Sequence, residues 1–132
     1  GDVYKRQERH QSVLMRNLGI ILAEILDAMD AAKEASLAVP FSEFANNRML
    51  RLATERAIEI ISEAVRHLPQ DLLDRHPEIE WPKIKAIGNI LRHEYHRIAP
   101  KVVWDAVQYD FESLEAALKH EQKRAESESN LP

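Results

Sequence analysis

Apolar residues recur at spacings of three and four in four separate segments of this chain of 132 residues, and prolines separate those segments. Such spacing lines up apolar side chains along one face of an α-helix. No segment alternates apolar and polar residues as a half-buried strand would. The sequence therefore predicts an all-α protein. We expect an antiparallel bundle of four to five helices, in which short connectors make successive helices neighbours.

Prolines and capping residues mark the expected helix boundaries. The first helix is predicted over about Ser12–Leu37, where Leu14 and later apolar residues form its stripe. The next helix runs to Leu68, with Ser42 as a candidate N-cap, and its first turn is open to interpretation as a separate short helix. Pro82 and Pro100 suit the first turns of the last two helices, because a first turn needs no proline N–H.

Both ends of the chain are expected to lie outside the folded domain. The first seven residues, "GDVYKRQ", look like one reading frame of a sequencing-library adapter. Residues 1–7 are therefore expected to be either non-native, with the true N-terminus missing, or a short disordered lead-in. Residues 121–132, "EQKRAESESNLP", show no apolar periodicity before the last two, which predicts a polar flexible tail. The domain is thus expected over residues 8–120.

Composition excludes several classes of protein. The net charge of −4 argues against broad non-specific nucleic-acid binding, and no DNA partner is expected, although a local basic site stays open. The chain has no cysteine, which excludes disulfides and thiolate metal sites and fits a cytoplasmic protein. No apolar run approaches the roughly 18 residues of a membrane span. The polar start shows no signal peptide, so no membrane association is expected.

The segment "GNILRHEYHRI", residues 88–98, gathers charged and titratable side chains on the third predicted helix. On a helical period one stripe carries Asn89, His93 and His96, and an adjacent stripe carries Gly88, Arg92, Tyr95 and His96. An imidazole can take a proton from a ribose 2′-hydroxyl. A guanidinium can hold a phosphate and offset its developing charge. These groups are the minimal set for metal-independent RNA cleavage, but the chemistry alone favours the other interpretation, a merely solvated helix face.

Other chemistries find little support in the sequence. His93 and His96 are three apart, whereas the zincin motif needs two histidines four apart to face one metal. No metal or cofactor is therefore expected, and no nucleotide-binding loop or serine-hydrolase motif is present. Glu59 and Glu63 of the second long helix are candidates for lining a cleft. His76 is expected to be an ordinary connector residue.

Three segments carry a family resemblance. They read "EIISEAVRHLP", "RHPEIEWPKIKAIGNILRHEY" and "VVWDAVQYDFESLEAAL". In order, they resemble an I-I-G-E-A helix, a P-x-I-P-W connector into a motif helix, and a V-W-x-x-V-x-x-D-L-x-x-L final helix. Over about residues 13–118 the chain resembles the HepT-like (DUF86) branch of the HEPN superfamily. The resemblance implies a HEPN-type bundle that forms a homodimer, with the motif helices lining a cleft between protomers.

The resemblance also implies a function. Family members are usually toxins of type II toxin–antitoxin pairs, and active members are metal-independent ribonucleases with a motif often written R-N-x-x-x-H-x-Y. By position, His93 matches the general acid and base, and Asn89 the residue that orients the site. Tyr95 matches the tyrosine that a minimal nucleotidyltransferase antitoxin can adenylylate. The implied partners are RNA, a second protomer and a cognate nucleotidyltransferase antitoxin.

The arginine of that motif is replaced here by Gly88. One explanation is that Arg92 substitutes for it, from one turn further along or from the other protomer. A second is a catalytically impaired HEPN dimer that binds a protein partner or RNA, and a third is a different substrate or chemistry. Glycine inside a helix costs about 1 kcal/mol relative to alanine. Gly88 therefore either permits the close approach of another backbone or of RNA, or marks the lost arginine.

Overall fold

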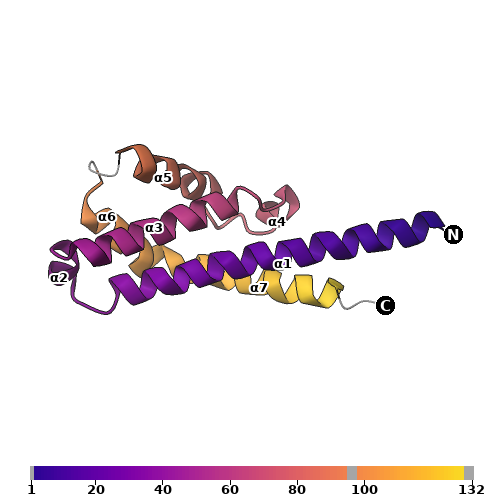
Figure 1. The fold of residues 1–132 in the computed structure, drawn as a ribbon, viewed down its shortest axis with the longest axis horizontal. Coiled ribbons are helices and arrows are strands. Elements are labelled where there is room, and N and C mark those ends of the chain that lie inside the picture. Colours follow the sequence, from indigo (N-terminus) through magenta and orange to yellow (C-terminus); the bar gives the residue numbers. More distant parts are fainter. Residues whose placement is uncertain (1, 95–97, 130–132) are drawn as a thin grey trace.

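A computed structural model of the chain describes residues 2–94 and 98–129, and every regular element in these residues is helical (Figure 1). The elements are α1 (Asp2–Ser36), α2 (Phe41–Ala45), α3 (Arg48–Val65), α4 (Gln70–Asp74), α5 (Trp81–Glu94), α6 (Pro100–Asp105), the π-helix η2 (Ala106–Asp110) and α7 (Phe111–Ser129). The all-α prediction is confirmed, and the short helix expected before the second long one is α2.

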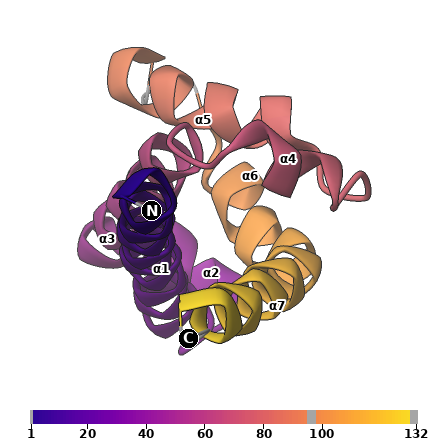
Figure 2. The same cartoon turned by 90° about the vertical axis from the view of Figure 1, so that its right-hand side faces the viewer.

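The long helices pack antiparallel around α1. Helix α1 contacts α3 and α7, and α5 lies on α3 (Figure 1). Successive long helices run in opposite directions, so the C-terminal end of α5 points toward the N-terminal end of α3. Seen along α1, α5 and α4 form one side of the molecule and α7 lies on another (Figure 2). Among the described helices, none is both long and apolar enough to cross a membrane.

The core follows the periodic stripes of the sequence. Leu22, Ile25 and Met29 of α1 are fully buried, at spacings of three and four. They meet Val65 of α3 and Leu118 of α7 in one cluster of buried apolar side chains. Since burial of one such side chain stabilises a fold by about 1.5 to 3 kcal/mol, these stripes account for the packing of three helices on one another.

The predicted cap of the second helix is wrong. Ser42 lies inside α2, which begins directly after Pro40. The helix that follows, α3, is capped by Asn47, whose Oδ1 accepts a hydrogen bond of 3.0 Å from the backbone N–H of Leu50. Asparagine is among the best N-caps because its side-chain oxygen satisfies a donor that the helix leaves free. The chain therefore starts α3 five residues later than Ser42 suggests.

The last long helix is interrupted by a single π-helical turn. The apolar residues Val103, Val107 and Phe111 are spaced by four twice, and all three are buried. In an α-helix that spacing would rotate the third side chain by about 80° away from the first. The wider turn of η2, Ala106–Asp110, absorbs the extra residue and returns Phe111 to the core.

The predicted flexible tail is wrong for the residues that the structure describes. Helix α7 continues from Phe111 to Ser129, and Ala125 is buried. Glu121, the first residue of the expected tail, is only 1% exposed. At the other end of the chain, residues 2–7 extend α1 and are exposed, so they add nothing to the core.

Candidate active site

Polar contacts from α3 hold the backbone of the motif helix. Ser62 donates its hydroxyl to the carbonyl oxygen of Lys85 at 3.0 Å, and its Oγ accepts from the N–H of Gly88 at 3.2 Å. Arg66 donates to the same Lys85 oxygen at 2.9 Å. Because these bonds reach backbone atoms of α5, they fix its height and rotation on α3. The side chains of the motif are thereby placed by the α3 contact.

Gly88 is required by this packing. A Cβ atom at position 88 would lie 2.5 Å from Oγ and 2.6 Å from Cβ of Ser62. Both distances are far below van der Waals contact, so any side chain at position 88 would have to displace α3 or reorient Ser62. Of the interpretations open for Gly88, the structure favours the close approach of a neighbouring element, and that element is α3. The arginine of the family motif has no room at this position.

Three of the predicted catalytic residues share an exposed face of α5. Asn89, Arg92 and His93 are all exposed and lie three and four residues apart. Arg92 Nη2 lies 3.5 Å from Asn89 Oδ1, which is a long hydrogen bond. Arg92 and His93 lie in the last turn of α5, where the helix dipole favours positive charge. The face therefore offers a guanidinium, an imidazole and an amide to solvent.

The other predicted residues are placed differently. Tyr95 and His96 lie outside the described residues. Glu59 is partly buried, pairs with Arg56 at 3.3 Å, and lies on the α5 side of α3, since its carbonyl oxygen is 3.7 Å from where a Cβ of residue 88 would lie. Glu63 is exposed and lies 3.6 Å from His67, so its ion pairs hold it along the surface of α3. The structure thus brings Glu59 toward the motif helix and does not bring Glu63 there.

Two further charged residues, which were not predicted as part of the site, lie on the same face of α3. Arg51 and Glu55 precede Glu59 and Ser62 at intervals of four, four and three, so all four lie on the α5 side of the helix. Burial raises the pKa of Glu55 above its ordinary value, while the charge of Arg51 acts against this shift and that of Glu59 adds to it. Nε of Arg51 is buried and has no hydrogen-bond partner among the described residues. Their helical spacing from Ser62 is the sequence signal that could have placed them on this face.

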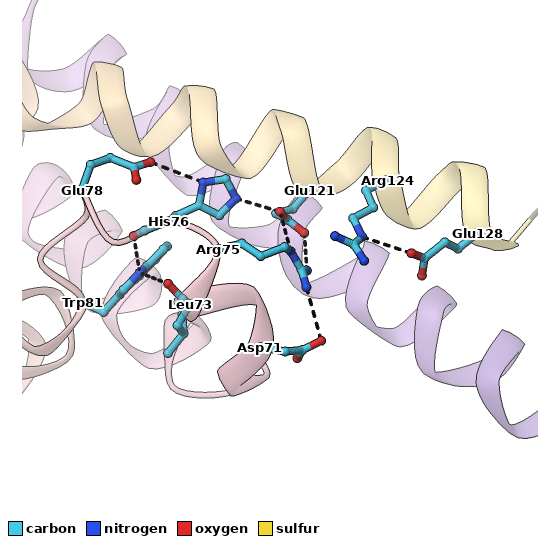
Figure 3. A network of polar contacts seen from close by, with 9 residues as sticks. All are labelled: Asp71, Leu73, Arg75, His76, Glu78, Trp81, Glu121, Arg124 and Glu128. Carbon is cyan, nitrogen blue, oxygen red and sulfur yellow. Dashed lines mark hydrogen bonds and ion pairs between the residues drawn. The ribbon is translucent and has the colours of Figure 1, made fainter.

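A second polar cluster lies at the opposite end of α5 (Figure 3). Glu121 of α7 accepts two hydrogen bonds from Arg75, of 2.6 Å and 3.2 Å, and its Oε2 lies 2.7 Å from Nε2 of His76. The other ring nitrogen of His76 is 3.3 Å from Glu78, and Arg75 also bonds Asp71 at 3.3 Å. Burial opposes ionisation of Glu121, but the bonds from Arg75 and His76 outweigh it and keep its pKa below the ordinary value.

This cluster holds the start of the motif helix. Trp81, the first residue of α5, is buried, and its indole N–H donates to the carbonyl oxygens of Leu73 and His76, both at 3.1 Å. His76 is therefore no ordinary connector residue, because it contacts Glu121 through its ring and Trp81 through its backbone (Figure 3). The cluster of Asp71, Arg75, His76, Glu78 and Glu121, called here the Glu121 cluster, ties α7 to the beginning of α5.

In residues 2–94 and 98–129 no group of three or more potential ligands from His, Cys, Asp or Glu is close enough to hold a metal ion. The functional groups that this part of the chain does offer on α5 are those of proton transfer and phosphate binding.

The comparisons with known proteins identify the family. The family model described as "Ribonuclease HepT-like" matches residues 25–121, which include α3, α5 and the Asn89–Arg92–His93 face. The chain therefore belongs to the ribonuclease HepT-like family.

Two curated relatives cover most of the domain. A protein of Methanocaldococcus jannaschii named "Putative RNase MJ1380" is 34% identical over 95 residues, which is 72% of this chain and 87% of the relative. "Probable ribonuclease HepT" of Thermococcus cleftensis is 32% identical over 93 residues, 70% of this chain and 84% of the relative. No solved structure gives a significant match.

Proposed function

We propose that this protein is a metal-independent endoribonuclease whose reaction takes place on the Asn89–Arg92–His93 face of α5. One observation carries the proposal: a guanidinium, an imidazole and an amide share one exposed face of a helix whose backbone is held against α3 at Gly88. Relatives with ribonuclease in their names give the proposal its substrate class. RNA, with its 2′-hydroxyl next to a phosphodiester, is the substrate that these groups suit.

The proposed chemistry is attack by the RNA on its own backbone. The imidazole of His93 takes the proton of a ribose 2′-hydroxyl, and the 2′-oxygen forms a bond to the adjacent phosphorus. The bond from phosphorus to the 5′-oxygen breaks, and that oxygen gains a proton from solvent. Arg92 binds the non-bridging phosphate oxygens and stabilises their charge in the transition state, while Asn89 orients the guanidinium. The products are a 2′,3′-cyclic phosphate and a 5′-hydroxyl.

The products give the test of this proposal. Purified protein is incubated with single-stranded RNA in EDTA, and the new ends are analysed by mass spectrometry. We expect cleavage with 2′,3′-cyclic phosphate ends, and none by the His93→Ala variant. Intact RNA at high enzyme concentration would contradict the proposal if the protein is folded. Ends with 5′-phosphate would also contradict it, because they require water as the nucleophile.

The biological role extends the proposal. By family resemblance, the protein is a cytoplasmic toxin of a type II toxin–antitoxin pair, neutralised by a nucleotidyltransferase that adenylylates Tyr95. Growth arrest on expression, relieved by co-expression of an adjacent nucleotidyltransferase gene, would support this role. Mass spectrometry of the co-expressed protein should find an added adenylate on Tyr95. Growth that continues unchanged, together with an unmodified Tyr95, would exclude it.

A homodimer is also part of the proposal. An apolar groove of about 340 Å³ lies beside the motif helix, lined by Ile84 and Ile87 of α5 and by Val102 of α6. Val102 is 51% exposed, so an apolar surface beside α5 is open to a second protomer. Light scattering of the purified protein should give twice the mass of the chain, and Val102→Glu should shift it to monomer. A monomeric wild type would exclude the dimer.

One observation favours a second candidate function. Because Ser62 leaves no space for a side chain at position 88, the arginine of the family motif is excluded from its usual place. A catalytically impaired HEPN dimer that binds RNA or a protein partner would have this feature. Binding of RNA without cleavage by the wild type would favour this alternative. Cleavage that depends on His93 and on Arg92 would exclude it.

A further inference from the structure

Arg51 stands out among the described residues because one nitrogen of its guanidinium is buried without a hydrogen-bond partner. Its Nε is buried, yet among residues 2–94 and 98–129 it has no hydrogen-bond partner. A buried donor without an acceptor costs about 1 to 3 kcal/mol. Burial raises the pKa of Glu55, one turn further along α3, and the charge of Arg51 acts against this larger effect. Arg75, by contrast, is paired with both Glu121 and Asp71.

The helix packing places Arg51 near the candidate site. Helices α3 and α5 run antiparallel and are joined where Ser62 meets Gly88. From that contact, Arg92 and His93 lie four and five residues along α5, toward the end of α3 at which Arg51 lies. At a rise of 1.5 Å per residue, Arg51 lies about 9 Å further along this direction than His93. The distance between neighbouring phosphates of an extended strand, together with the length of an arginine side chain, is enough to span it.

The charged residues around Arg51 also bear on whether this end of the molecule can bind a polyanion. This end of the molecule carries Arg48 and Arg51 on α3 and Arg92 and His93 on α5, all exposed or partly buried. Glu55 and Glu59 lie on the same side of α3, and burial raises the pKa of Glu55, which opposes its negative charge. Phosphates of a nucleic acid are attracted by such a group even when the rest of the protein is acidic.

We propose that Arg51 is a second phosphate contact of the RNA site, and that it supplies from α3 the guanidinium that position 88 cannot hold. Arg92 would bind the phosphate at which cleavage takes place, and Arg51 a neighbouring phosphate of the same strand. The inference rests on the proposed function for the identity of the ligand as RNA. It does not rest on cleavage, because a phosphate contact contributes to binding whether or not the bond breaks.

Binding of an RNA that cannot be cleaved tests Arg51 by itself. The probe is a mixed-sequence single-stranded oligonucleotide with 2′-O-methyl groups throughout, which lacks the attacking hydroxyl. We expect Arg51→Gln to weaken binding about tenfold to hundredfold, the loss of one charge-assisted contact. The slope of log affinity against log salt should also fall by about 0.7, the value for one phosphate contact on a single strand. Arg51→Lys should retain the slope, because the charge remains.

The matched control is Arg124→Gln, which removes the same charge from α7 at a residue paired with Glu128. It should leave affinity and slope near the wild-type values, and circular dichroism should show that all variants are folded. Equal binding by wild type and Arg51→Gln would overturn the inference, even if the wild type cleaves RNA. Weakened binding by Arg51→Gln in a protein that never cleaves RNA would support Arg51 and contradict the nuclease. A wild type that binds no RNA would overturn both.

Discussion

The two ends of α5 carry polar clusters that differ in how their groups are paired. At the start of the helix, each charged side chain of the Glu121 cluster has a partner, and Glu121 itself accepts three close contacts (Figure 3). Near the end of the helix, Asn89 and Arg92 share one contact of 3.5 Å, and His93 is exposed. The first cluster is built into the interface of α4, α5 and α7. The second faces solvent.

This difference indicates what each cluster does. Buried charges must be paired, since an unpaired buried charge is strongly destabilising, and a paired cluster is therefore able to fix the position of a helix. Exposed groups with few partners are able to bind a ligand without first breaking bonds within the protein. We therefore expect substitutions in the Glu121 cluster to change stability, and substitutions on the Asn89–Arg92–His93 face to change activity. The predictions below test this separation.

The largest expected effect is on catalysis. Replacing His93 by alanine should lower the rate of RNA cleavage by about 10²- to 10⁴-fold, the usual contribution of a general acid or base. The free energy of unfolding should stay within about 0.5 kcal/mol of the wild type, because His93 is an exposed side chain. Kinetics and urea denaturation on the same preparations measure both quantities. A large loss of stability would show that His93 stabilises the fold. It would contradict the separation between residues that affect stability and residues that affect activity.

The next effect is on stability. Glu121→Ala leaves the charge of Arg75 without its buried carboxylate and the ring of His76 without its partner on α7, and should lower the free energy of unfolding by about 3 kcal/mol. The matched control is Glu128→Ala on the same helix, which removes a surface ion pair with Arg124 and should cost less than about 1 kcal/mol. Urea denaturation compares the two variants. If both lose the same small amount, the Glu121 cluster does not hold α7 to the start of α5.

Two glycine substitutions should have opposite signs. Gly19→Ala adds a methyl group where nothing lies within 4 Å, so the helix propensity of alanine should raise stability by about 1 kcal/mol. Gly88→Ala adds the same group 2.5 Å from Ser62 Oγ, and overpacking of about 1 to 3 kcal/mol should make its net effect destabilising. The melting temperatures of the two variants show whether each substitution raises or lowers stability. Adding Ser62→Gly to Gly88→Ala should recover part of the loss, and equal stabilisation by both alanines would contradict the packing role of Gly88.

The smallest expected effect is on the pH dependence of stability. The pKa of Glu121 is lowered in the folded protein, so its contribution is fully present above its unfolded value, near 4.5. That contribution is lost as the pH falls through the lower folded value. Wild type should therefore lose more stability between pH 6 and about pH 3 than the Glu121→Gln variant does. Parallel curves for the two proteins would show that the carboxylate of Glu121 is not stabilised by its partners.

Helical periodicity was sufficient to predict the class of fold and the exposed face of the motif helix. Both depend on local spacing: Leu91 is buried while Asn89, Arg92 and His93 are exposed, as one helical face requires. Glu121 was missed because a charged residue was taken as the start of a polar tail. It nevertheless follows Leu114 and Leu118 by seven and three residues and precedes Ala125 by four, so it continues their stripe. A carboxylate in apolar register was a signal of a buried ion pair.

Other features could not be read from local sequence. The role of Gly88 depends on Ser62, which lies 26 residues away and becomes a neighbour only when α3 and α5 pack. Likewise, the unpartnered Nε of Arg51 is recognised only when its neighbours in the fold are known. The π-helical turn also escaped prediction, although the repeated spacing of four from Val103 to Phe111 records the extra residue that it absorbs.

Single-turnover cleavage of RNA in EDTA, measured for wild type and His93→Ala with matched circular dichroism spectra, tests the central claim most directly. We expect the wild type to produce 2′,3′-cyclic phosphate ends and the variant to be slower by at least about 10²-fold, without a change in fold. Equal rates for the two folded proteins, or no cleavage by the wild type, would contradict the claim that the exposed face of α5 is an active site.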